Sequence, residues 1–138
     1  MKKLLGIVVL GLLWCNVSFA ETIESIEKKY ESSLPECEGG EAYIPEDLMR
    51  VIKWNNCFGT QILIEGDQKT IFNMEFKDGD MKGKGTIMGH GGVKFFVEFK
   101  GGGFCKRNGY ALLDDGRIFK AKFSKTCDPK IVKEIIPE

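Results

Sequence analysis

The sequence predicts a mainly β protein, an antiparallel sheet of about three hairpin repeats capped by short N- and C-terminal helices. Two observations carry this prediction. Phenylalanine pairs four residues apart recur at steps of 23 and 24 residues, at Phe72/Phe76, Phe95/Phe99 and Phe119/Phe123. Apolar and polar residues also alternate through each pair, and glycines bracket them. A fixed period of this size is typical of repeat architectures, and such alternation is typical of half-buried strands.

Residues 1–20 have the features of a bacterial export signal. Two lysines precede an apolar run from Leu4 to Trp14, and Ser18-Phe19-Ala20 ends in small residues at the positions a signal peptidase requires. We expect cleavage after Ala20 and a periplasmic or secreted protein with no transmembrane span. A lipid-anchored form through Cys15 is disfavoured, because the bulky Trp14 precedes that cysteine. The mature chain of 118 residues would form about one domain.

Residues 21–53 are expected to form an N-terminal cap and a segment tethered by a disulfide. Ile23, Ile26, Tyr30 and Leu34 follow one another at three- and four-residue steps, which predicts a short amphipathic helix ended by Pro35. Our interpretation is that this helix covers an open end of the sheet, since unpaired edges must be protected. A helix that binds a partner is the alternative.

Residues 54–125 contain the hairpin repeats. In the first, Phe72, Met74 and Phe76 should point to one side of a strand and the polar residues between them to the other. Phe95-Val97-Phe99 and Phe119-Ala121-Phe123 form the equivalent faces. Strands Thr86–Met88 and Tyr110–Leu113 lie between them, with turns at GHGG and DDG. One apolar face per strand would build a shared core.

These repeats resemble the MORN family, whose units look like Y-x-G-E-F-K-D-G-x-x-x-G-x-G-T. Phe72 to Thr86, FNMEFKDGDMKGKGT, matches closely, with Phe72 in place of the tyrosine and Met74 in place of the first glycine. The second unit, FFVEFKGGGFCKRNGY, carries one inserted residue before Gly109, and WNNCFGT at Trp54–Thr60 is similar to the end of a unit. The resemblance implies protein–protein contacts or phospholipid binding, and it implies no catalytic residues or cofactor.

The glycine-rich stretch GDMKGKGT is not expected to bind a nucleotide. A Walker-type loop has four residues between its glycines and then Gly-Lys-Ser/Thr before a helix. Here three residues separate Gly79 from Gly83, and Lys84 is followed by Gly85. We therefore expect these glycines to serve tight turns and close contacts between strands.

Residues 126–138 are predicted to form a C-terminal capping helix. Asp128 could cap it, and Pro129 suits its first turn. Its apolar side would consist of Ile131, Val132, Ile135 and Ile136.

The four cysteines of the mature chain are expected to form two disulfides, because exported proteins fold under oxidising conditions. Three pairings are possible. If Leu112 lies opposite Phe119 across the DDG turn, Cys105 and Cys127 lie nearly opposite each other on the same ribbon. Cys37 would then pair with Cys57. Zinc is disfavoured, since no C-x-x-C pair is present.

Charge is distributed unevenly along the chain. Residues 21–80 hold 14 acidic and 6 basic residues, whereas residues 81–125 hold 3 acidic and 10 basic. A solvated surface is the simplest interpretation of the basic half. The functional hypothesis is a patch for anionic lipid or an acidic partner, and the two halves could also join copies of the chain. The patch would comprise Lys82, Lys84, Lys94, Lys100, Lys106, Arg107, Lys120 and Lys122. Nucleic acid is disfavoured by the overall charge.

No catalytic constellation is evident in the sequence. The one histidine, His90, lies in a GHGG turn, and the acidic pairs Asp78/Asp80 and Asp114/Asp115 also lie at predicted turns. The sequence therefore favours a non-catalytic exported binding or scaffold protein without a cofactor. The alternatives are a small enzyme acting on envelope polymers and a homo-oligomeric structural protein.

Overall fold

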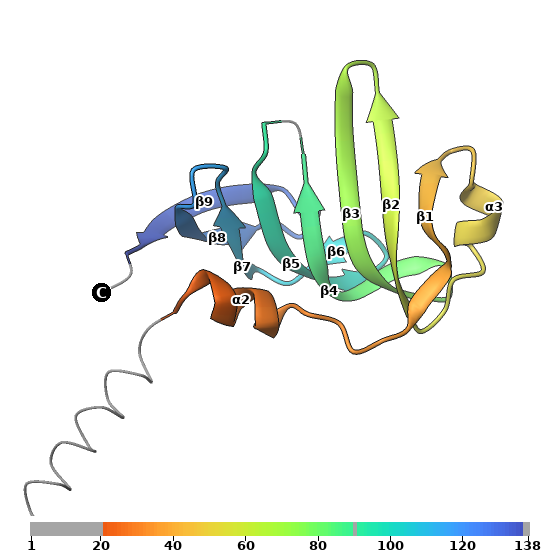
Figure 1. The fold of residues 1–138 in the computed structure, drawn as a ribbon, viewed down its shortest axis with the longest axis horizontal. Helices are drawn as coiled ribbons and strands as arrows, with labels where there is room; N and C mark the ends of the chain where they lie inside the picture. Colours follow the sequence, from red (N-terminus) through yellow and green to blue (C-terminus); the bar gives the residue numbers. More distant parts are fainter. Residues whose placement is uncertain (1–20, 90, 137–138) are drawn as a thin grey trace, which may run out of the picture.

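The computed structural model describes residues 21–89 and 91–136, so the predicted signal peptide and His90 lie outside the described residues. The described residues form one open nine-stranded sheet with two short helices (Figure 1). Neighbouring strands follow the order β1-β2-β3-β4-β5-β7-β8-β9, and β6 pairs with β5. All pairs are antiparallel except β1 with β2, which is parallel. The mainly β prediction is confirmed.

The elements have the following bounds. The helices are α2 (Ile23–Lys29) and α3 (Leu48–Val51). The strands are β1 (Glu36–Ile44), β2 (Cys57–Glu65), β3 (Gln68–Lys77), β4 (Asp80–Met88), β5 (Lys94–Gly101), β6 (Phe104–Cys105), β7 (Asn108–Leu112), β8 (Ile118–Phe123) and β9 (Pro129–Ile135).

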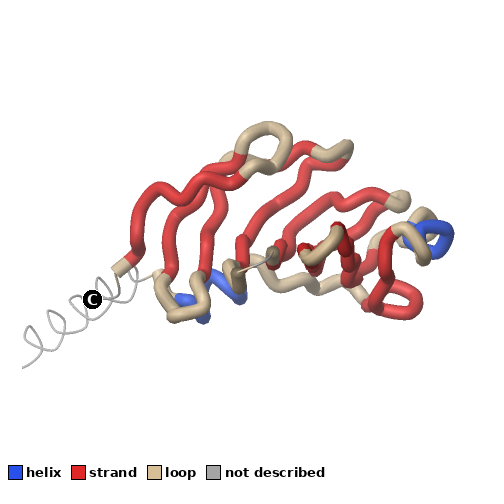
Figure 2. The backbone as a smooth tube through the Cα atoms, turned by 90° about the horizontal axis from the view of Figure 1, so that it is seen from above, coloured by secondary structure: helices blue, strands red, loops and turns tan. Residues whose placement is uncertain are grey.

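One face of the sheet, here called the phenylalanine face, carries the predicted apolar positions of all three repeats. Met74, Phe76, Val97, Phe99 and Phe123 are at most 5% exposed and belong to one core cluster. Phe72, Phe95 and Phe119 are half-buried against the same cluster. The predicted alternation is therefore confirmed in β3, β5 and β8. Figure 2 shows the curvature of the sheet that holds these strands.

Aligned glycines make room for this core. Gly59 and Gly85 lie on either side of Met74 in the ladders of β2, β3 and β4, and Gly85 is also opposite Val97. A Cβ atom at Gly85 would lie 2.6 Å from the Met74 sulfur and 2.9 Å from its Cα, inside contact distance. At Gly109 a Cβ would be 2.5 Å from the Phe123 ring. The glycines of the repeat thus serve close packing.

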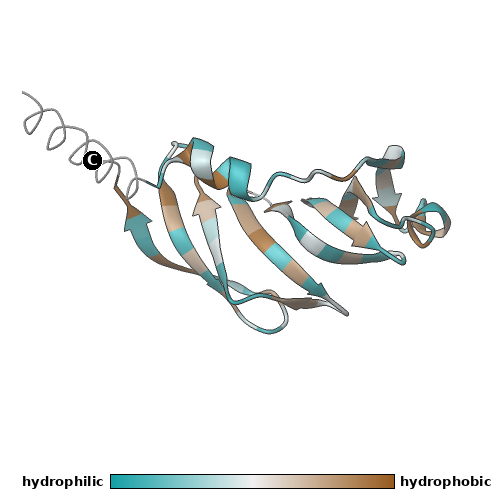
Figure 3. Cartoon of the chain, turned by 90° about the horizontal axis from the view of Figure 1, so that it is seen from below, coloured by the Kyte–Doolittle hydropathy of each residue, from teal (hydrophilic) through white to brown (hydrophobic). Residues whose placement is uncertain are grey.

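The opposite face, here called the helix face, is covered in part by α2 (Figure 3). Thr22 and Ser25 form a capping box that begins this helix. Ile26, which is 1% exposed, packs with Phe96, Tyr110 and Ile118. The predicted N-terminal helix is confirmed, but it is shorter than residues 21–34, and it lies on a face between β5 and β8 instead of at an open edge.

The predicted C-terminal helix is wrong, because Pro129–Ile135 forms strand β9 antiparallel to β8. Residues 137–138 of that prediction lie outside the described residues. Ile131, Val132 and Ile135 are β-branched, and such side chains are stiff in helices and suit a pleated strand. Asp128 does not cap a helix; its backbone N–H donates to the Ser124 hydroxyl at 3.1 Å and closes the β8–β9 turn.

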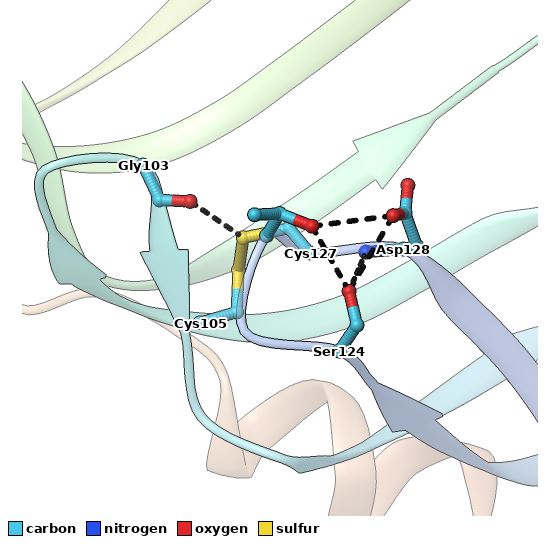
Figure 4. Close-up of a disulfide and its surroundings, with 6 residues drawn as sticks. Gly103, Cys105, Ser124, Cys127 and Asp128 are labelled. Carbon is cyan, nitrogen blue, oxygen red and sulfur yellow. Dashed lines mark hydrogen bonds between the residues drawn. A yellow bond between two sulfur atoms is a disulfide. The ribbon is translucent and has the colours of Figure 1, made fainter.

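Both predicted disulfides are present, Cys37–Cys57 and Cys105–Cys127. Figure 4 shows the second, which ties β6 to the β8–β9 turn. The register used to predict it is off by one residue, since Leu112 lies opposite Ile118 and not Phe119. The Leu113 N–H donates to the Arg117 carbonyl, and Gly116 has φ of 90°, so the hairpin has a three-residue loop.

Candidate functional site

Two pairs of lysines face each other directly across β8 and β9. Lys120 is opposite Lys133, and Lys122 is opposite Lys130. Residues opposed in an antiparallel ladder have their side chains on the same face, with Cβ atoms about 5 Å apart. Like charges in this position are destabilising. All four side chains are exposed, so water screens part of the repulsion.

A fifth lysine, Lys29, comes from the last turn of α2. It lines a pocket of about 460 Å³ on the helix face together with Lys120, Lys122 and Asn108. Its ammonium nitrogen lies 5.8 Å from the centroid of the Tyr110 ring, within cation–π range. We call Lys29, Lys120, Lys122, Lys130 and Lys133 the lysine cluster.

None of these five lysines forms an ion pair with a carboxylate among the described residues. The ion pairs found there are Arg50–Asp47, Lys106–Glu98 and Arg117–Asp115. The cluster therefore concentrates positive charge on neighbouring strands without internal compensation. An arrangement of this kind favours an anionic ligand, which would relieve the repulsion between the opposed lysines.

Two tyrosines form the apolar wall of the pocket. The rings of Tyr30 and Tyr110 meet edge to face with centroids 6.1 Å apart, and the Tyr110 hydroxyl donates to Glu21 at 2.9 Å. Burial and the hydrogen bond to the Glu21 carboxylate raise the pKa of Tyr110 from 10.0 to about 12. Burial, and then the charges of Glu98 and Glu21, raise the pKa of Tyr30. Both hydroxyls therefore stay protonated at neutral pH. They offer hydrogen-bond donors and aromatic ring surface to a ligand, and they do not act as a base.

The predicted basic patch does not form one surface of equivalent side chains. Lys120 and Lys122 join the lysine cluster, whereas Lys106 pairs with Glu98 at 2.6 Å. Lys94 is half-buried, with its ammonium nitrogen 5.5 Å from the Phe96 ring centroid. The remaining members differ in exposure: Lys84 is half-buried, and Lys82, Lys100 and Arg107 are exposed.

Sequence reasoning missed Lys29, Lys130 and Lys133. The last two were placed on a helix, where they would not face β8. The signal that could have found them is the β-branched run Ile131-Val132 directly after the Cys127 turn, which favours a strand. Lys29 could be placed only once the packing of α2 on the helix face was known.

The glycine-rich stretch has a structural role. Asp78 and Gly79 have positive φ and form the β3–β4 turn, which is fastened to the preceding segment by a hydrogen bond from the Gly79 N–H to the Trp54 carbonyl at 2.8 Å. The Lys84 N–H donates to the Glu75 carboxylate at 2.9 Å, so this amide is occupied by the protein itself. The Ser32 hydroxyl donates to the same carboxylate at 2.8 Å, which fastens the segment after α2 to β3.

The described part of the chain contains no group of three or more His, Cys, Asp or Glu side chains placed to hold a metal ion. No helix within it is long and apolar enough to cross a membrane. Comparison of the chain with known protein families, curated proteins and solved structures finds no match.

Proposed function

We propose that the chain is a non-catalytic exported protein, built on a MORN-like sheet, that associates with anionic lipid through the lysine cluster. The observation that carries this proposal is the direct opposition of Lys120 with Lys133 and of Lys122 with Lys130 without a nearby carboxylate partner. Each lysine close to an anionic membrane contributes about 1 kcal/mol of attraction. The two disulfides and the signal-like residues 1–20 support export to an oxidising compartment.

An exposed apolar side chain next to the lysines supports a membrane surface as the partner. Val132, which is 50% exposed, lies between Lys130 and Lys133 and lines the same pocket as Lys29, Lys120 and Lys122. Peripheral proteins combine such side chains with basic residues, because the apolar groups enter the interface while the charges meet the headgroups. Lys120 and Lys122 would then contact headgroup phosphates from the strand next to β9.

Vesicle co-sedimentation of the oxidised mature chain tests the proposal. We expect binding to vesicles that contain anionic lipid, no binding to zwitterionic vesicles, and weaker binding at high salt. Changing Lys120 and Lys122 to Glu should lower partitioning by about thirtyfold or more, from about 1 kcal/mol per lost lysine. The double variant Lys69→Glu and Lys77→Glu is the matched control, because it makes the same change of charge at exposed positions of β3.

An equal loss in both double variants would show that net charge, and not the lysine cluster, governs binding. No binding to either vesicle would reject the lipid proposal. Protein–protein contact would then be the second candidate, and the exposed apolar side chains around α3 favour it.

A further inference from the structure

Exposed large apolar side chains gather at the two ends of the sheet. Nine such residues are found in the described part of the chain. Five lie at the β1–α3 end: Tyr43, Leu48, Met49, Ile52 and Ile64. Three lie at the β9 end: Ile131, Val132 and Ile136. β1 and β9 are the first and last strands of the sheet order, so these two surfaces face away from each other (Figure 1).

The two ends carry opposite charge. Residues 36–67, which include β1, α3 and β2, hold seven acidic and two basic residues. Residues 117–136, which include β8 and β9, hold six basic and two acidic residues. Apolar side chains of this kind within a charged rim are typical of protein interfaces. Each end would repel a copy of itself and attract the other end.

The shapes of the two ends also differ. At the β1–α3 end a pocket of about 490 Å³ is lined by Tyr43, Ile44, Pro45, Glu46, Asp47 and Ile64. At the β9 end, Ile131 and Val132 project from an edge strand that pairs only with β8 among the described residues. This apolar pocket carries the carboxylate of Glu46 and that of Asp47, which is paired with Arg50. It is complementary to apolar side chains flanked by lysines.

We propose that copies of this chain associate head to tail, with the β9 end of one copy docking on the β1–α3 end of the next. The partner that binds at each end is thus a second copy of the same chain. Because the two surfaces are different, the contact is heterologous. A dimer formed in this way still has one free β9 end and one free β1–α3 end. The association therefore continues beyond two copies as the concentration rises.

Sedimentation velocity over a range of concentrations, at low and high salt, tests this proposal. The wild-type protein should grow beyond a dimer at low salt and dissociate at high salt, where charge attraction is screened. Met49→Lys places a cation on the acidic end, and Ile131→Glu places an anion on the basic end. Each variant alone should lose association by about tenfold or more in apparent Kd, because like charges then meet at the interface.

Mixing the two variants is the decisive step. The intact basic end of Met49→Lys can dock on the intact acidic end of Ile131→Glu, so the mixture should associate at concentrations where neither variant associates alone. Phe104→Glu is the matched control, since Phe104 is 50% exposed on β6, away from both ends, and its replacement should leave association unchanged. Thermal unfolding of each variant checks that the fold is intact.

Two results would overturn the proposal. A wild-type protein that stays monomeric, or a mixture that stays monomeric while Phe104→Glu still associates, would exclude head-to-tail docking. Wild-type growth that stops at a dimer would show a two-fold contact instead. The inference does not rest on lipid binding, because Met49→Lys should weaken self-association and leave the lysine cluster intact.

Discussion

The two faces of the sheet are built from the same strands but differ in how similar their equivalent residues are from repeat to repeat. On the phenylalanine face, the equivalent positions of the three repeats carry Phe76, Phe99 and Phe123, all at most 5% exposed. On the helix face, the position just before each of these residues carries Glu75, Glu98 and Lys122. Glu75 accepts bonds from Ser32 and Lys84, Glu98 pairs with Lys106, and Lys122 belongs to the lysine cluster.

This difference indicates that the repeat restricts the choice of side chain on one face of the sheet and not on the other. The close approach of strands at Gly59, Gly85 and Gly109 leaves little freedom to the side chains that pack over them on the phenylalanine face. Residues on the helix face meet water, α2 or one another, so each repeat can carry a different side chain there. Packing thus belongs to the repeated face, and the face that differs between repeats is the one through which we propose that the protein binds.

The largest expected effect is the loss of a ring from the phenylalanine face. Phe123→Ala should lower the free energy of unfolding by about 3–5 kcal/mol, the usual cost of removing a buried aromatic side chain. Lys122→Ala, one residue away on the helix face, should change it by no more than about 0.5 kcal/mol. Urea denaturation under non-reducing conditions measures both. Similar losses in the two variants would contradict the division between the faces.

A smaller effect is expected when a methyl group is added beneath the same core. Gly85→Ala should lower the free energy of unfolding by about 2–3 kcal/mol, because its Cβ meets the Met74 side chain and backbone. Gly89→Ala is the control, since its Cβ would meet no atom within 4 Å. Urea denaturation again provides the comparison. Equal stabilities of the two variants would show that the strands can move apart at Gly85.

The helix face depends on Tyr110 for a weaker, pH-dependent contact. Tyr110→Phe removes the hydrogen bond to Glu21 and should cost about 1 kcal/mol at neutral pH. The folded pKa of about 12 lies above the unfolded value of 10.0, so this stabilisation is complete below pH 10 and is lost as the pH rises towards 12.

The difference in stability between the wild type and Tyr110→Phe should therefore shrink between pH 10 and about 12. Tyr30, whose pKa is also raised, is present in both proteins, and its charge is the last of the causes that raise the pKa of Tyr110. Urea denaturation at each pH measures the difference. A difference that stays constant over this range would show that Tyr110 ionises equally in the folded and unfolded protein.

The sequence predicted correctly those elements in which the spacing of apolar residues fits a strand and not a helix. Alternation around Phe72, Phe95 and Phe119 identified the phenylalanine face, and the proximity of Cys105 and Cys127 survived a register error of one residue. The run from Ile131 to Ile136 fits both a helical stripe and a strand, so spacing alone could not identify β9. Strand β1 was missed because Gly39 and Gly40 interrupt its pattern and its hydrogen bonds go to a parallel neighbour.

The candidate site was only partly predictable for a related reason. Lys120 and Lys122 could be assigned to a polar face, but their partners Lys133 and Lys130 follow from a pairing that only the fold defines. Counting charged residues along the sequence showed that this part of the chain is basic, but it did not show which lysines face one another. The position of Lys29 likewise depends on tertiary packing, since α2 reaches strands more than 60 residues away in the sequence.

One variant measured in two ways tests the central claim, that the opposed lysines are retained for binding and not for stability. Lys133→Glu places a carboxylate opposite Lys120, so it should raise the free energy of unfolding by about 0.5 kcal/mol at low salt. The same variant should lower partitioning onto anionic vesicles by about fivefold or more, from about 1 kcal/mol for the lost lysine. Higher stability together with weaker binding is the predicted result. Unchanged or stronger vesicle binding by the variant would contradict the account.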